Sequence, residues 1–124
     1  GARHRVEVRN FPWGSGVGQK RDTPPFELCG DQWLLRLYPG GFSEGSRGHV
    51  GVFVCYAGRR VPLTVSYSVT VVGRDGSALR RLGFAGKTFE RKGQGRGWDV
   101  FVRRDELRKA CPDGDFSFVV EMQA

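Results

Sequence analysis

The chain has 124 residues, a net charge of +7 at pH 7 and a pI near 9.9. This length fits one domain, residues 1–124, that buries roughly two-thirds of its unfolded surface, and it excludes a second domain. Nineteen glycines and six prolines separate many short apolar runs, which is typical of an all-β fold and not of a helical or alternating one.

The first third of the chain predicts three short strands and one long loop. Residues 4–9 alternate valines with charged residues, as in a strand with one wet face. Residues 14–25 are rich in glycine and charge and predict a surface loop, which leads into a short extended piece at residues 26–29. Residues 32–38 alternate again and end at Pro39-Gly40-Gly41, so we expect a strand that is buried on at least one side.

The middle of the chain has the clearest strand signals. Residues 49–56 form a nearly continuous run of β-branched and aromatic residues, long enough for a central strand and too short for a typical helix. Residues 63–72 alternate with a period of two. After a hairpin-like turn at residues 73–76, we expect two shorter strands, around residues 78–82 and 87–90.

The last third combines a turn, a strand and a helix. Gly95 and Gly97 allow the chain to turn sharply and to place Trp98 on a strand end, and alternation predicts that Phe101 points inward. We expect Asp105 to cap a short helix over residues 105–110, followed by a final strand at residues 116–122. The chain as a whole therefore predicts an eight-stranded antiparallel β-sandwich with one short helix.

The cysteines indicate a reducing compartment. Cys29, Cys55 and Cys111 are odd in number and have no metal-binding spacing. We expect three free thiols with Cys55 the most buried, no metal or other cofactor, and a location in the nucleus or cytoplasm. No apolar run approaches the length of a membrane span, so we expect no membrane partner. The sequence ends directly after a strand, and we expect the domain to belong to a longer protein.

Four segments resemble the MATH domain, the meprin and TRAF homology family, in order and at matching spacing. They are residues 6–11, residues 33–41, the apolar run from His49, and residues 97–107 with the sequence GWDVFVRRDEL. The resemblance covers nearly the whole chain and is nearest to the speckle-type POZ and plant MATH-BTB subfamilies. It implies a TRAF-like antiparallel sandwich that binds short extended peptides in a shallow groove across one sheet.

The resemblance also implies which residues line that groove. Carried over position by position, they are His49, Tyr67, Phe89, Arg96, Gly97, Trp98 and Asp99. His49 and Arg96 stand where the speckle-type subfamily has aromatic residues. The implied role is that of a substrate adaptor for a ubiquitin ligase, which would reach a cullin-type ligase through a BTB or other segment outside these residues.

The residues themselves leave other roles open for the aromatic positions. Tryptophan supplies large contact area to a peptide, but at position 98 it would also suit the sandwich core. Tyr67 shares a face with three valines, and Phe89 in a short strand is also suited to the core. His49, at the start of a strand, would by default be an exposed polar residue.

Two glycine-rich motifs do not predict an enzyme. Residues 41–45 match the Gly-x-Ser-x-Gly nucleophile elbow, which requires a helix after it, but another strand is expected there. Residues 93–97 lack the following helix of a phosphate-binding loop. We therefore predict no catalysis.

The positive charge leaves a different binding function open. Arginine-rich clusters at residues 59–60, 80–81, 91–96 and 103–109 could attract nucleic acid or acidic surfaces. They fall in separate turns and are mixed with acids, which favours a solvated surface. A TRAF-like signalling or oligomerisation scaffold is a further alternative.

Overall fold

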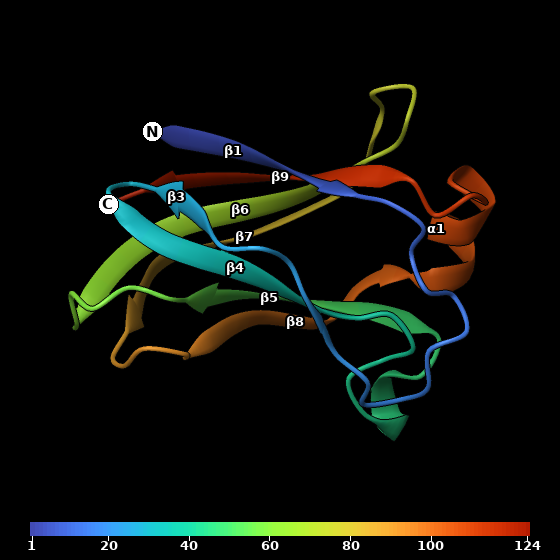
Figure 1. Ribbon diagram of the computed structural model, residues 1–124, viewed down its shortest axis with the longest axis horizontal. Coiled ribbons are helices and arrows are strands. Elements are labelled where there is room, and N and C mark those ends of the chain that lie inside the picture. The colour runs from blue at the N-terminus through green and yellow to red at the C-terminus, as the bar shows by residue number, and fades with distance from the viewer.

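Nine strands in two layers and one short helix make up the computed structural model, which describes residues 1–124 (Figure 1). One sheet has the strand order β1-β9-β6-β7 and the other β2-β4-β5-β8, with β3 paired to β4. The strands are β1 (Ala2–Val8), β2 (Arg21–Asp22), β3 (Phe26–Leu28), β4 (Asp31–Tyr38), β5 (His49–Tyr56), β6 (Leu63–Val72), β7 (Ala78–Phe89), β8 (Gly95–Arg103) and β9 (Phe116–Gln123). All pairings are antiparallel. The predicted sandwich is confirmed. It has nine strands and not eight, and the additional strand is the two-residue β2.

The core is built from the inward faces of both sheets, because the alternating strands turn their apolar residues to the same side. At one end of the core, Trp33, Tyr56 and Phe89 are each 0% exposed, and the Trp33 ring lies 5.0 Å from Tyr56 and 5.1 Å from Phe89. Their polar tips have partners: the Trp33 indole N–H donates to the Leu28 carbonyl and the Tyr56 hydroxyl donates to the Asp31 carboxylate. The aromatic cluster therefore carries no desolvation penalty from unpaired groups.

Two sequence predictions about element boundaries are wrong. Residues 78–89 form one strand and not two, because the pairing with β6 shifts register opposite Val65–Tyr67 and then continues. The Gly86 N–H donates to the Ser66 hydroxyl at this irregularity. A β-bulge thus replaces the break that the glycines suggested.

The helix α1 (Arg104–Ala110) begins one residue earlier than predicted, with Arg103 and not Asp105 at the N-cap. Asp105 lies inside the first turn, where its carboxylate accepts from the Glu106 N–H at 2.9 Å and from Arg103 at 3.4 Å. The hydrogen bond from Arg103 holds the pKa of Asp105 below its usual range. The acid therefore stabilises the start of the helix from within the turn.

The three thiols are free. Cys111 is 0% exposed and Cys55 is 2% exposed, so the prediction that Cys55 is the most buried is wrong. The single α-helix has seven residues, and none of the helices is long and apolar enough to cross a membrane.

An irregularity in β8 determines which of its residues enter the core. Val50 of β5 pairs with Val102, but Val52 pairs with Trp98, so two steps along β5 correspond to four along β8. As a result Phe101 and Val102 are both buried, although strict alternation would expose one of them. Val100, in the irregular part, is 43% exposed.

The contrast between these neighbours gives a stability test. Replacing the fully buried Phe101 by Ala should lower the free energy of unfolding by about 3 to 5 kcal/mol, because it leaves a cavity between the sheets. Val100→Ala should change it by less than about 0.5 kcal/mol, since that side chain is exposed. Urea unfolding measures both, and similar losses in the two variants would contradict the inward placement of Phe101.

Candidate functional site

The two sheets end side by side at strands β7 and β8, which leaves one side of the sandwich open. Each strand pairs with only one neighbour, β7 with β6 and β8 with β5. A side chain bridges the gap: Arg96 Nε donates to the Thr88 carbonyl at 2.8 Å. Because β8 pairs only with β5, its second edge has no backbone partner and is available to a further extended segment.

A stack of side chains fills this open side. The Phe84 and Trp98 rings are nearly parallel, 4.9 Å apart with an interplanar angle of 15°. The Lys87 ammonium lies 4.9 Å from the centre of the Phe84 ring, and the Tyr67 ring meets Trp98 edge-on at 5.9 Å. Phe84, Lys87 and Trp98 are half-buried, so they cover the core and still present surface to a ligand.

Five of the seven predicted groove residues come together here. Tyr67 contacts Trp98 and Phe89, and the Arg96 guanidinium lies 6.0 Å from the centre of the Phe89 ring. Gly97 separates Arg96 from Trp98 on β8. The remaining two, His49 and Asp99, lie outside the cluster: His49 pairs with Arg103 at the other end of β8, and Asp99 is exposed in the irregular part of that strand.

Two of the clustered residues lie beneath the surface. Phe89 is 0% exposed and Tyr67 is 4% exposed, so their rings form the floor on which Trp98 and Arg96 rest. The Tyr67 hydroxyl is buried without a hydrogen-bond partner, and burial raises the pKa of Tyr67 well above its usual value.

Gly97 has a steric role that its neighbours impose. It pairs with Phe53 of β5, and a Cβ atom built on it would collide with the Val52 carbonyl oxygen and the Phe53 Cα. Only glycine allows this close approach of the two backbones. The residue therefore fixes the position of Arg96 and Trp98 relative to β5.

Sequence reasoning missed Phe84 and Lys87. Phe84 lies between the two expected strands, residues 78–82 and 87–90, and Lys87 is the first residue of the second. Both reach the groove because β7 is continuous. The available sequence signal was the strand-like spacing of the apolar residues Leu82 and Phe84 on either side of Gly83.

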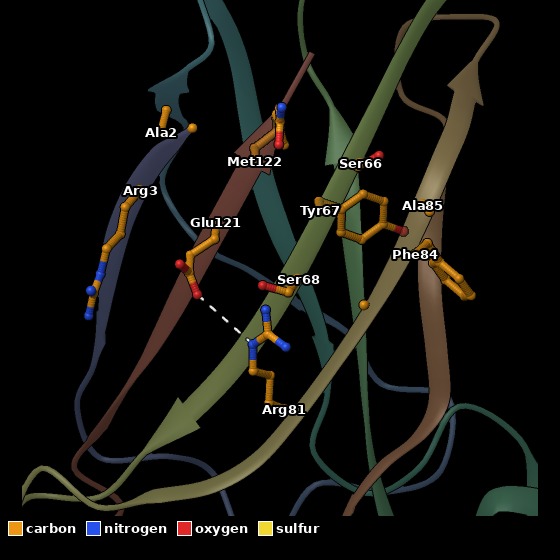
Figure 2. A pocket seen from close by; sticks show the side chains of 13 residues that line it. Ala2, Arg3, Ser66, Tyr67, Ser68, Arg81, Phe84, Ala85, Glu121 and Met122 are labelled. Carbon is orange, nitrogen blue, oxygen red and sulfur yellow. Dashed lines mark ion pairs between the residues drawn. The ribbon is translucent and has the colours of Figure 1, made fainter.

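A hollow with a volume of about 740 Å³ lies beside this groove, over the outer face of the β1-β9-β6-β7 sheet. Figure 2 shows Ser66 and Ser68 of β6 along its floor and the ion pair between Arg81 and Glu121, which are 4.0 Å apart. Tyr67 and Phe84 also line it. The hollow thus adjoins the aromatic stack, but small and polar side chains make up most of its wall.

The Gly-x-Ser-x-Gly segment does not form a nucleophile elbow. After Ser43 the chain makes a 3-10 turn, Glu44–Ser46, and then enters β5. An elbow requires a strand, a sharp turn and an α-helix in that order. No cluster of three His, Cys, Asp or Glu side chains is placed to hold a metal ion.

The comparisons with known proteins place this architecture in a class. TRAF5 of Notothenia coriiceps has a similar structure, with a TM-score of 0.78 and 17% sequence identity over 98% of this chain and 73% of that one. The fold is therefore that of the TRAF-like antiparallel sandwiches. The family model of the MATH domain matches residues 3–122, so the chain belongs to the MATH domain family. A search of curated proteins found no match.

Family membership sets the general role of the domain. MATH and TRAF-like domains are protein-interaction modules that bind partner proteins. The expected resemblance and the expected fold class are thus confirmed.

The close approach at Gly97 predicts a sharp loss of stability on substitution. Gly97→Ala should lower the free energy of unfolding by more than about 2 kcal/mol, because the added methyl group collides with backbone that cannot move independently. Gly14→Ala is the matched control, since a Cβ there meets nothing within 4 Å. Equal stability of both variants in urea unfolding would contradict the packing of β8 on β5.

The buried Tyr67 hydroxyl predicts a pH effect. Because the pKa is raised from an ordinary value of 10.0 in the folded chain, the unfolded chain loses this proton first, and stability present below pH 10 declines as the pH rises further. Tyr67→Phe should therefore show a smaller decline above about pH 10. At neutral pH the variant should be at least as stable as the wild type, because the hydroxyl has no partner to lose. A less stable variant at neutral pH would reveal a hydrogen bond at this hydroxyl.

Proposed function

We propose that this domain binds short linear segments of partner proteins in an extended conformation along the free edge of β8. The observation that carries the proposal is the half-buried stack of Trp98 on Phe84 beside an unpaired strand edge. An added strand gains main-chain hydrogen bonds from the edge, and its alternate side chains contact the aromatic surface. Tryptophan is well suited to such an anchor because it offers large contact area at low entropic cost.

The charged residues around the stack support a preference for polar or acidic segments. Lys87 and Arg96 border the aromatic surface on two sides, and neither forms an ion pair. Asp99 supplies one acidic side chain farther along β8. The net charge of +7 adds a field that attracts acidic partners. Arg96, where the speckle-type subfamily has an aromatic residue, makes this groove more polar than its counterparts in that subfamily, whereas His49, which also stands in place of an aromatic residue, lies outside the cluster.

The resemblance to MATH-BTB proteins supports a wider role as the substrate-recognition part of a ubiquitin-ligase adaptor. In that role a BTB or equivalent segment elsewhere in the protein contacts a cullin-type ligase. The free thiols agree with the reducing environment of the nucleus or cytoplasm. Sequencing the transcript on both sides of this domain tests the adaptor role, and a transmembrane or catalytic domain in place of BTB would overturn it.

If Trp98 lines a peptide groove, its replacement should affect peptide binding more than folding stability. Trp98→Ala should weaken peptide binding by about 2 kcal/mol or more, roughly thirtyfold, because it removes an anchoring ring. The loss of folding stability should be smaller than that of Phe101→Ala, since Trp98 is half-buried and leaves no closed cavity. A peptide array followed by fluorescence polarisation with the best peptide measures binding, and thermal unfolding measures stability.

Phe42→Ala is a matched aromatic control, because Phe42 is 45% exposed and packs on Tyr38 and Phe53 away from the stack. It should bind peptide normally. Normal binding by Trp98→Ala, or equal weakening in both variants, would contradict the groove. An array with no bound peptide, together with tight binding of an oligonucleotide, would favour the nucleic-acid alternative.

A further inference from the structure

A small pocket surrounded by arginines lies at the corner where β8 passes into α1. It has a volume of about 250 Å³ and is lined by Gly48, Arg103, Arg104, Asp105 and Arg108. Three arginines against one aspartate leave its lining with a net charge of +2. A water molecule takes about 30 Å³ in the liquid, so the pocket has room for an anionic group the size of phosphate.

The carboxylates of this corner do not neutralise two of the three arginines. Arg103 lies 3.4 Å from the Asp105 carboxylate and 3.9 Å from that of Glu106. Arg104 and Arg108, one helical turn apart, form no ion pair. The acids are therefore matched by Arg103, and two guanidinium groups remain to bind an external anion.

Hydrogen-bond donors around the pocket also lack acceptors within the protein. Arg104 Nε is buried without a partner, and so is the indole N–H of Trp13, whose ring lies 5.9 Å from the Arg108 guanidinium. His49 Nδ1, a nitrogen that can donate or accept, is also buried without a partner, and His49 lines the adjoining hollow that shares Arg103. Buried donors in folded proteins normally have partners. Their concentration at one basic corner indicates a place for an acceptor-rich ligand.

We propose that this pocket binds the phosphate of a phosphorylated side chain in a partner protein. A phosphomonoester carries a charge near −2 at neutral pH and three acceptor oxygens, which matches two unpaired guanidinium forks better than a single carboxylate does. The pocket is compact, whereas the basic residues at 59–60 and 91–92 lie in the loops at the opposite end of the sandwich from α1 (Figure 1). A nucleic acid would need several phosphate sites in a row, so the arrangement favours one localised phosphate.

The test is an NMR titration of the 124-residue chain with O-phosphoserine, with serine as the uncharged comparison. Phosphoserine should shift the amide signals of Gly48 and of residues 103–108, and serine should not. The double variant R104Q/R108Q should weaken binding at least about tenfold, because both charge-assisted contacts are lost. R108Q alone changes an exposed side chain and should weaken binding at least about threefold, which decides the matter if the double variant unfolds.

R59Q/R91Q is the matched control, because it removes the same charge from two exposed arginines that form no ion pair. It should leave phosphoserine binding within about twofold, as expected when contact and not overall charge determines affinity. Equal loss in both double variants, or shifts spread over all basic clusters, would overturn the pocket. If a single-stranded oligonucleotide bound the same amides more tightly than phosphoserine, the assignment to a phosphorylated protein would be wrong. Because phosphoserine alone is the probe, the result is independent of the peptide groove.

Discussion

The stack of Lys87, Phe84 and Trp98 closes the side of the sandwich where the edge strands β7 and β8 lie side by side without backbone pairing. A sandwich with two unpaired edges exposes its core between them, and here that core includes Tyr67 and Phe89. Rings from β7 and β8 cover it without joining the strands by backbone hydrogen bonds. The same arrangement that protects the core therefore leaves a strand edge and an aromatic surface together, which is what an extended ligand requires.

The strands that could be predicted from sequence are those whose burial is uniform along their length. β5 and β6 have the predicted limits because every inward position of each is apolar and no glycine interrupts the alternation of β6. β7 could not be predicted as one strand, since Gly83 and Gly86 suggest a break. The pairing that carries the strand through Gly86 depends on the Ser66 hydroxyl of β6, a contact between positions twenty residues apart.

The groove positions were predicted on a different basis. Alternation alone puts Trp98 and Phe101 on opposite faces of β8 and cannot tell a ring that covers the edge of the core from one that is fully exposed. That distinction depends on β8 being the last strand of its sheet, which follows from the order of strands and not from local sequence. The resemblance to the MATH family supplied the order and hence Trp98, Arg96 and Gly97. It could not supply Lys87, whose position over the Phe84 ring depends on the bulge in β7.

The ion pairs distinguish the arginines of the chain that are already bound to carboxylates from those that are not. Many of its arginines are held by carboxylates, as Arg36 is by Asp22 and Arg60 by Asp31. In such pairs the guanidinium is already bound to an acid of the same chain, so it contributes little to the recognition of an external anion. Three of the arginines without a carboxylate lie at the two sites: Arg96 lies at the aromatic stack, and Arg104 and Arg108 line the pocket at α1. Since β8 leads from Arg96 to the start of α1, the length of one strand separates these two groups of unpaired arginines.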